Sequence, residues 1–308
     1  MIAVIGATGF TGHRIVHAVR ESVPSEAIAA VVRPTSDRRR LASTGAEFRL
    51  ADLADVQALT LALRGAQTVV CAASLGFGHA QSICTAIAAS EPRHAVFFST
   101  TSISTRVPNT SRETRILAEQ LIWASGVPAT IVRPTMIYGR PGDRNIERLL
   151  EFLRWSPVVP VLDQGRALQQ PVHVDDLAEA VVAILGCRER TVGRTYNLPG
   201  PEAMSYAVLV QRAGAALGRR PLQLPVPGRA ARTLARAWSR THMWPRVSEE
   251  QVKRVLENKN FSWSEAGSDF GYRPRPFAAG VALEATLLRL PTPRGLLGTM
   301  AEGTTRTP

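Results

Sequence analysis

Short apolar runs alternate with amphipathic stretches through the first 135 residues. The stretches with helical periodicity are Thr11–Arg20, Val56–Leu63, His79–Ala89 and Arg112–Ala124. The runs that predict β-strands are Ile2–Ile5, Ile28–Val32, Glu47–Leu50, Thr68–Cys71, Ala95–Phe98 and Thr130–Val132. Repeated strand–helix units predict a parallel sheet with helices on both faces, the doubly wound α/β arrangement. In such a Rossmann-type sheet, ligands lie at the carboxyl ends of the strands.

After Pro134 the pattern changes to helical stretches with one strand-like run, Arg194–Leu198, and Pro-rich joints at Pro157–Pro160 and Pro221–Pro227. The predicted helices are Asn145–Trp155, Val174–Leu185, Tyr206–Leu217, Ala230–Arg240 and Glu249–Leu256. We therefore expect a Rossmann domain over residues 1–135. A smaller substrate lobe over residues 136–290 would be interleaved with the last sheet strands. Residues 291–308 have no periodicity and predict a mobile tail.

A glycine motif joins the first predicted strand to the first predicted helix. Gly6 permits the tight turn, Gly9 lets the backbone approach a pyrophosphate, and Gly12 lets helix and strand pack closely. Free N–H groups and the positive end of the helix dipole would then meet the phosphates. The motif predicts a dinucleotide site, formed by Gly6, Thr8, Gly9, Phe10, Thr11 and Gly12.

The residue at the end of the second strand predicts which dinucleotide binds. Arg33 stands where an acidic residue would accept hydrogen bonds from a ribose 2′-hydroxyl. A guanidinium suits a 2′-phosphate by charge and geometry, so NADP(H) is favoured over NAD(H). Arg38 is a second candidate contact, although Arg33 could instead be a solvent-facing loop residue.

Two further strand ends contribute candidate cofactor contacts. Asp52 and Leu53 end the third strand, where Asp52 could bind the adenine amino group or cap the next helix. The small residues Ala72, Ala73 and Ser74 end the fourth strand and would let a cofactor ribose lie close.

Composition narrows the class of protein. With 308 residues and 45% hydrophobic content, the chain can bury a large core. It has no run long enough to span a membrane and no signal-peptide pattern, and its three cysteines fit buried free thiols, so we expect a cytoplasmic protein without a metal site. The net charge is +12, yet 35 of the 37 basic residues are arginines spread along the chain. We attribute the many arginines to the codon bias of the genome. The positive charge favours anionic small molecules over nucleic acid as binding partners. Whether the protein is a monomer or a homodimer stays open.

Several local runs resemble the short-chain dehydrogenase/reductase superfamily, in its extended and atypical branch with the NAD-dependent epimerase/dehydratase and NmrA-like groups. The resemblance covers about residues 1–285. Besides the glycine motif, it rests on the runs 97–102 (FFSTTS), 118–119 (AE), 124–127 (ASGV), 132–139 (VRPTMIYG), 171–178 (PVHVDDLA) and 271–277 (GYRPRPF). The resemblance implies an NAD(P)-dependent enzyme and places Thr100, Pro134, Thr135 and Ile137 beside the cofactor.

The family's catalytic pair is missing. The resemblance implies a tyrosine that transfers a proton and, four residues later, a lysine that lowers its pKa and holds the ribose. Ser111 and Arg115 stand at these positions, and no Tyr-x-x-x-Lys occurs in the chain. Serine is too weak an acid to replace tyrosine unaided, whereas arginine can still hold a ribose. The acid–base machinery is therefore absent or rebuilt.

Three other residues are candidates for the chemistry. Thr101 matches the family's catalytic Ser/Thr, although its hydroxyl could simply bond to backbone. His79 follows a Gly-Phe-Gly loop and could be an acid or base, or a surface histidine at a helix start. Tyr138 could donate a proton or pack in the core.

For the charged residues outside the motifs, the sequence allows either a purely structural role or ligand binding. Asp175 and Asp176, after His173, fit a helix start. Arg140 and Arg144 are candidates for binding an anionic substrate group. Arg229, Arg232, Arg236 and Arg240 share one helical face, which is either solvated or binds an anion.

The sequence therefore predicts an NADP(H)-dependent oxidoreductase or epimerase-like enzyme with an atypical acid. The substrate would be a small carbonyl or hydroxyl metabolite or a nucleotide sugar. A redox-silent NADP(H)-binding sensor or assembly protein, and a non-redox isomerase or cyclase, stay open as alternatives.

Overall fold

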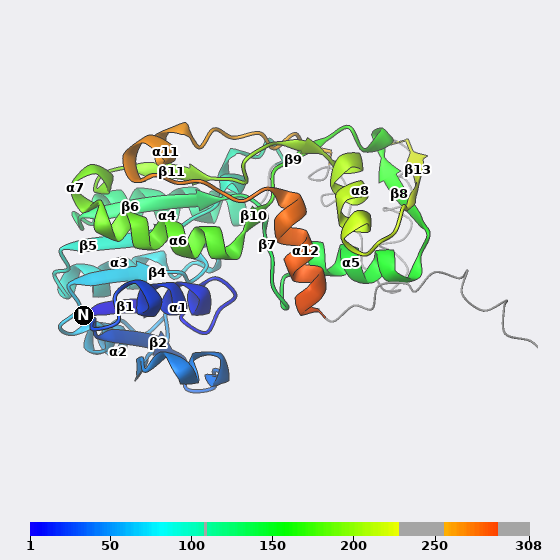
Figure 1. The fold of residues 1–308 in the computed structure, drawn as a ribbon. Helices are drawn as coiled ribbons and strands as arrows, with labels where there is room; N and C mark the ends of the chain where they lie inside the picture. Colours follow the sequence, from blue (N-terminus) through cyan, green and yellow to red (C-terminus); the bar gives the residue numbers. More distant parts are fainter. Residues whose placement is uncertain (108–109, 228–255, 289–308) are drawn as a thin grey trace, which may run out of the picture.

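The computed structural model describes residues 1–107, 110–227 and 256–288. Its centre is a seven-stranded sheet in the order β11-β6-β5-β4-β1-β2-β3, with every neighbouring pair parallel (Figure 1). The strands are β1 (Ile2–Ile5), β2 (Ile28–Val32), β3 (Glu47–Leu50), β4 (Thr68–Cys71), β5 (His94–Phe98), β6 (Ala129–Pro134) and β11 (Thr195–Leu198). The predicted doubly wound Rossmann fold is confirmed.

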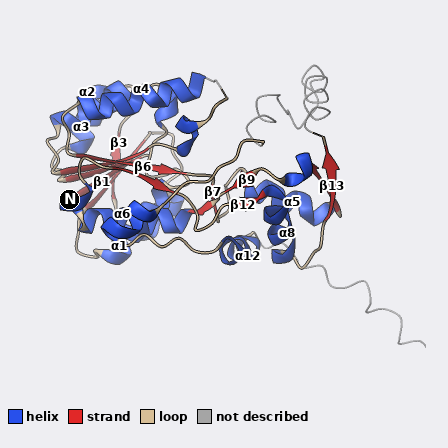
Figure 2. Cartoon of the chain, turned by 90° about the horizontal axis from the view of Figure 1, so that it is seen from above, coloured by secondary structure: helices blue, strands red, loops and turns tan. Residues whose placement is uncertain are grey.

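Helices cover both faces of this sheet (Figure 2). One face carries α1 (Gly12–Ser22) and α6 (Val174–Gly186), and the other carries α2 (Val56–Leu63), α3 (Ala80–Ala89) and α4 (Thr110–Ala124). Each layer has its own apolar core, because side chains of successive strand residues point to opposite faces. Val4 and Val70 pack toward α1 and α6, whereas Ile5 and Cys71 pack toward α2 and α3.

A smaller lobe lies beyond the carboxyl ends of the strands and has a third core. Its elements are β7 (Ile137–Tyr138), α5 (Ile146–Trp155), β8 (Val158–Leu162), β9 (Leu168–Gln169), β12 (Met204–Ser205), α8 (Tyr206–Ala216), β13 (Leu222–Val226) and α12 (Phe277–Leu287). Between these stretches the chain returns to the main sheet through β10 (Val172–His173), α6, α7 (Arg188–Thr191), β11 and α11 (Ser264–Phe270). The lobe is thus assembled from separated parts of the chain.

The Pro-rich joints are strands in the structure. Residues 158–162 and 222–226 pair in parallel, with Leu224 opposite Pro160 and Pro225 opposite Val161. Interpreting them as joints was wrong because a two-stranded sheet has only edge strands, where a proline without an N–H group does no harm.

Helix boundaries differ from the predictions by up to two residues. The first helix begins at Gly12, with Thr11 as its N-cap, and ends at Ser22. The predicted helix Ala230–Arg240, nearly all of Glu249–Leu256, the four arginines of the shared face and the tail lie outside the described residues.

Two predictions from composition can be checked in the described part. None of its helices is long and apolar enough to cross a membrane. The three cysteines are free; Cys71 and Cys84 are buried and Cys187 is half-buried. Burial raises the pKa of the Cys71 thiol to about 12, which keeps it protonated and unreactive.

Candidate dinucleotide and substrate site

The glycine turn after β1 has no room for side chains. Gly6 has a φ of +75°, and the Gly9 N–H donates to the Gly6 carbonyl at 2.9 Å. A Cβ at Gly12 would collide with the same carbonyl oxygen. The N-cap residue Thr11 makes no side-chain hydrogen bond to the first turn of α1. The backbone N–H groups in the first turn of α1 are therefore suited to bind an anion, and the glycine turn fits the pyrophosphate of a dinucleotide.

The turn lies at the switch point of the sheet, where β1 is flanked by β2 and β4. A Cβ at Gly6 would lie 3.0 Å from the Ala73 nitrogen, so the chain after β4 runs against the turn. Ala72 is half-buried and Ala73 buried, while the Ser74 hydroxyl accepts from the Gly76 N–H at 3.3 Å. Crevices at switch points are where doubly wound sheets bind ligands.

The chain after β2 presents arginines at the adjoining edge. Arg33 is exposed, directly after the last residue of β2. The Arg38 guanidinium lies over the Phe48 ring, 5.4 Å from its centroid. Asp37 is paired with Arg39 at 2.7 Å, which lowers the pKa of Asp37 to about 2. The Asp37 carboxylate thus faces Arg39, which neutralises its charge.

Asp52 does not cap the helix that follows it. Its carboxylate accepts from the Ala54 N–H at 2.9 Å, and Asp55 is the cap of α2, accepting from Ala58. The alternative that Asp52 is the N-cap of this helix is therefore wrong, because α2 begins at Val56, directly after Asp55. Asp52 is exposed, and the Leu53 carbonyl accepts from the Ser82 hydroxyl at 2.5 Å.

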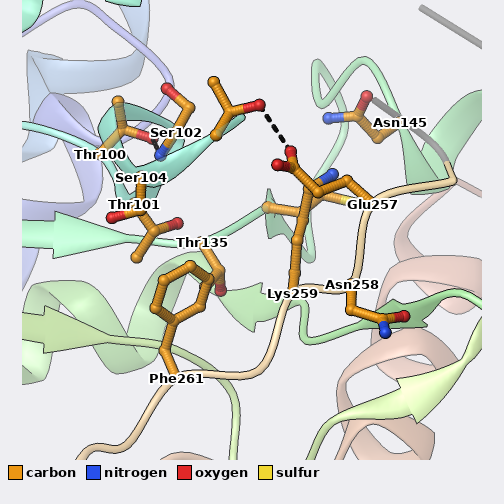
Figure 3. Close-up of a pocket in the computed structure, with 12 residues that line it drawn as sticks. Thr100, Thr101, Ser102, Ser104, Thr135, Asn145, Glu257, Asn258, Lys259 and Phe261 are labelled. Carbon is orange, nitrogen blue, oxygen red and sulfur yellow. Dashed lines mark hydrogen bonds between the residues drawn. The ribbon is translucent and has the colours of Figure 1, made fainter. Parts of the chain in front are cut away.

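A cavity of about 260 Å³ lies at the carboxyl ends of β5 and β6 (Figure 3). Rossmann-domain residues form one side of it and residues of a segment that precedes α11 form the other. The lining residues are Thr100, Thr101, Ser102, Ser104, Thr105, Thr135, Met136, Asn145, Glu257, Asn258, Lys259 and Phe261. The sequence-predicted residues Thr100, Thr101 and Thr135 are therefore brought together here.

The hydroxyl groups of the predicted residues are held by the backbone. Thr101 is buried and donates to the Pro134 carbonyl at 3.2 Å, which joins the ends of β5 and β6. Thr135 donates to the Gln170 carbonyl, and Thr100 accepts from the Ser102 N–H at 3.2 Å. Each hydroxyl oxygen still has accepting capacity toward a ligand.

One side of the cavity is lined by residues of segment 256–263, which we call the strap. Glu257 accepts from the Thr105 hydroxyl at 2.5 Å and from the Arg106 N–H at 2.6 Å. On the lobe side, the Lys259 N–H donates to the Leu168 carbonyl at 2.8 Å, and Gln170 binds both polar backbone atoms of Phe261. The strap thus connects the Rossmann domain to the lobe across the cavity.

Sequence reasoning missed the strap residues. In the sequence they follow the predicted helix Glu249–Leu256 and carry no motif, and nothing in their pattern indicates which strand ends they face. One available signal was composition: Lys259 is one of two lysines in the chain.

Ser111, Arg115 and His79 do not line this cavity. Arg115 donates to Ser111 on the same face of α4, and its guanidinium lies against Gly76 in the loop after β4. His79 is half-buried at the start of α3 without a capping hydrogen bond. Arg115 and His79 thus lie at the loop after β4 rather than at the cavity.

Tyr138 lies in the lobe core. It is fully buried, its hydroxyl donates to the Phe277 carbonyl at 3.4 Å, and its ring packs edge-on against His173. Burial strongly raises the pKa of its hydroxyl. This geometry favours the packing role that the sequence left open over proton donation to a ligand.

Asp175 joins three parts of the molecule. It accepts from Arg14 of α1 at 2.6 Å and from Arg140, in the loop after β7, at 2.7 Å. Burial acts to raise the pKa of Asp175, but hydrogen bonds from Arg140 and Arg14 lower it to about 2. Asp176 pairs with Arg275 at 2.5 Å. Arg140 is therefore part of an internal network, which weakens its case as a substrate anchor.

Fold, glycine turn and strand-end cavity together define a dinucleotide-binding protein of the short-chain dehydrogenase/reductase type, as the motifs predicted. A family model described as NAD(P)H-binding matches residues 6–187, and the chain belongs to that family.

Two of the relatives to which the chain is similar are named as a reductase and an oxidoreductase. The chain is 29% identical over 281 residues to the ceramide reductase of Caulobacter vibrioides, covering 86% of this chain and 87% of the relative. It is 32% identical over 136 residues to quinone oxidoreductase 2 of Escherichia coli, covering 43% of this chain and 48% of the relative.

Solved structures share the fold over nearly the whole chain. A nucleoside-diphosphate-sugar epimerase from Pseudomonas aeruginosa superimposes with a TM-score of 0.77 at 18% identity, covering 94% of this chain and 97% of that one. Triphenylmethane reductase of Citrobacter sp. complexed with NADP(H) gives 0.72 at 19% identity, covering 91% and 98%. These likenesses show that the Rossmann fold and the lobe are shared over nearly the whole chain.

Proposed function

We propose that the protein is an NADP(H)-dependent reductase of a small carbonyl compound. The observation that carries this proposal is the cavity where β5 and β6 end, in the same sheet as a glycine turn with no room for side chains. In this arrangement a bound nicotinamide would reach the cavity from the switch point. When bound, the cofactor supplies the hydride, and the protein supplies position and electrostatics.

The proposed preference for NADP(H) rests on the edge beyond β2. Arg33 is exposed there, and Arg38 is held over Phe48 close by. A 2′-phosphate would gain charge-assisted hydrogen bonds from these guanidinium groups, whereas a 2′-hydroxyl would find no acidic acceptor at position 33.

The proposed substrate class follows from the size and lining of the cavity. About 260 Å³ is small for a nucleotide sugar, and the Phe261 ring and Met136 provide apolar surface beside a row of hydroxyl groups. The names of the ceramide and quinone relatives also favour reduction over epimerisation. We therefore propose an aldehyde, ketone, enone or quinone as substrate.

The cofactor is tested by calorimetric titration of NADPH and NADH into the native protein and into Arg33→Ala. We expect Arg33→Ala to lose 10- to 100-fold in NADPH affinity, about 1.5–3 kcal/mol for a charged hydrogen bond, with NADH affinity unchanged. Arg39→Ala is the matched control, because Arg39 is paired with Asp37. Equal affinity of the native protein for both nucleotides would contradict the preference.

The reaction is tested by following NADPH oxidation at 340 nm with a panel of aldehydes, ketones, enones, quinones and nucleotide sugars. Turnover of a small carbonyl compound is expected, reduced in Thr101→Val. Tight NADPH binding without turnover of any member would instead favour a redox-silent sensor or assembly protein.

A further inference from the structure

We propose that Asn145 is a substrate-recognition residue of this cavity, and that the preferred substrate carries a hydroxyl group away from its reacting carbonyl. This inference rests on the reductase function proposed above and narrows its substrate class. The observation that points to it is an amide side chain that lines the cavity and has no hydrogen-bond partner within the described part of the chain (Figure 3).

The capping of α5 explains why this amide is left over. Asn145 stands directly before α5, at the position where asparagine commonly accepts from the first turn of a helix, yet its side chain makes no such hydrogen bond. The buried Asp143 takes this role. One of its carboxylate oxygens accepts from the N–H groups of Asn145 and Ile146, at 2.5 and 3.0 Å, and the other accepts from Glu147 at 3.2 Å. The helix therefore does not need the Asn145 amide.

Most of the other polar side chains that line the cavity are already bonded within the protein. The threonine hydroxyls and the strap carboxylate have the partners given above, and Asn258 accepts from a backbone N–H at 2.9 Å. Lys259 donates to a glutamine side chain. Over the described ranges, the polar lining side chains that make no hydrogen bond are those of Ser102, Ser104 and Asn145. Of these three, the amide alone offers two N–H donors together with a carbonyl acceptor.

Asn145 lies across the cavity from the strand ends. Figure 3 shows Thr101 and its neighbours on the left, at the end of β5, and Asn145 at the upper right, with Glu257 between them. The glycine turn follows β1, on the β4 side of β5, so a nicotinamide would enter beside the strand ends. The reacting carbonyl would then lie near Thr101, and Asn145 would meet the remote end of the substrate.

The middle of the cavity suits a short apolar body. The Phe261 ring and the Met136 side chain line it, and its volume is about 260 Å³. A remote hydroxyl group can exchange hydrogen bonds with the Asn145 amide. An alkyl group of the same size would strip that amide of water without replacing its hydrogen bonds, which costs free energy. The lining therefore favours hydroxylated carbonyl compounds over their hydrocarbon analogues.

Matched substrates test this preference. The parent is the panel carbonyl compound that the native protein reduces fastest. It is compared in two forms, with a hydroxymethyl group and with an ethyl group at the same remote position, as in para-hydroxymethylbenzaldehyde and para-ethylbenzaldehyde. We expect native kcat/KM to be about fivefold to tenfold higher for the hydroxymethyl form, the worth of one neutral hydrogen bond. Equal values for the two forms would overturn the proposal.

One substitution assigns the preference to Asn145. Asn145→Leu keeps the size of the side chain and removes its hydrogen-bonding groups. We expect kcat/KM to fall about fivefold to tenfold for the hydroxymethyl form and to stay native for the ethyl form. Tm should stay native, because the amide makes no hydrogen bond in the described chain. Asn260→Leu, the same change at an exposed strap residue that does not line the cavity, is the matched control and should keep the preference.

Each further outcome bears on a different claim. A retained preference in Asn145→Leu, or an equal loss for both substrate forms, would overturn the recognition role. NADPH affinity in this variant, measured by calorimetry, should stay within about twofold of native; a tenfold loss would assign the amide to the nucleotide and also overturn that role. Absence of NADPH binding, or of reduction of every panel carbonyl compound, by the native protein would overturn the proposed function itself and this inference with it.

Discussion

At the scale of single residues, Gly12 has no room for a side chain. A Cβ at position 12 would collide with the backbone carbonyl of Gly6, which, unlike a side chain, cannot move aside by changing its rotamer. The turn and the start of α1 would have to separate, and the N–H groups aimed at the crevice would move with them.

Gly12→Ala is therefore expected to weaken NADPH binding about tenfold or more and to lower the free energy of unfolding by about 1–3 kcal/mol, as overpacking does. Calorimetry and urea denaturation measure the two effects. Gly186→Ala, where an added Cβ meets open space, is the matched control. Native-like binding by Gly12→Ala would show that the turn does not hold the nucleotide.

Glu284 is a buried carboxyl group of α12 whose two oxygens have no hydrogen-bond partner among the described residues. Burial and the neighbouring Asp143 carboxylate raise its pKa to about 9. The folded state therefore keeps a proton that the unfolded chain releases near pH 4.5.

This raised pKa predicts that part of the stability is present below pH 4.5 and is lost as the pH rises toward 9, by at most about 1.4 kcal/mol per pH unit. Glu284→Gln should remove that part of the pH dependence and be more stable than the native protein at pH 8. Urea denaturation from pH 5 to 9 is the measurement. Parallel curves for the two proteins would mean that Glu284 is ionised in the folded state.

At the scale of elements, the Asp175 network fixes α1 against α6 and the loop after β7. One carboxylate accepts from both Arg14 and Arg140 and is nearly buried, so its loss leaves two guanidinium groups with unsatisfied charge. Removing one partner of a buried pair is costly for that reason.

Asp175→Asn is expected to lower the free energy of unfolding by about 3–5 kcal/mol at pH 7. In the native protein, this contribution should be present above pH 3.8 and vanish as the pH falls through about 2. Glu47→Gln, which removes an exposed pair with Arg49, should cost less than about 1 kcal/mol. Similar losses for both variants in chemical denaturation would contradict the network's importance.

Comparing predicted with observed strands shows which secondary-structure elements could be predicted from the sequence. Four strands, among them β1 and β4, have the predicted bounds because apolar runs bounded by turn residues leave little choice. The short strands β8 and β13 were not predicted, since prolines conceal an edge pairing between residues 64 positions apart. The strap follows no pattern in the sequence, and only the tertiary structure brings Lys259 and Thr101 to the same cavity.

For the molecule as a whole, the Rossmann domain and its glycine turn could be predicted from local patterns alone. The candidate cavity could be predicted only in part, because four of its twelve lining residues lie more than 120 positions away from Thr135 in the sequence. Thr100, Thr101 and Thr135 follow predictable strands; the opposing wall depends on how the lobe folds back.

Nucleotide binding should stabilise the whole chain. At 100 times its dissociation constant, NADPH is expected to add about 2.7 kcal/mol to the free energy of unfolding. This corresponds to a rise of about 5 °C or more in Tm, measured by scanning fluorimetry. Arg33→Ala should need more NADPH for the same rise. An unchanged Tm at saturating NADPH would argue that the nucleotide does not bind the native state.

The lobe core combines residues from three distant stretches of the chain, represented by Leu150, Leu209 and Val281. A single genetic crossover therefore cannot transplant this lobe intact from one relative to another. New specificity in such a scaffold has to arise by substitution within the existing walls, and an engineer who wishes to exchange the lobe needs several coordinated splice points.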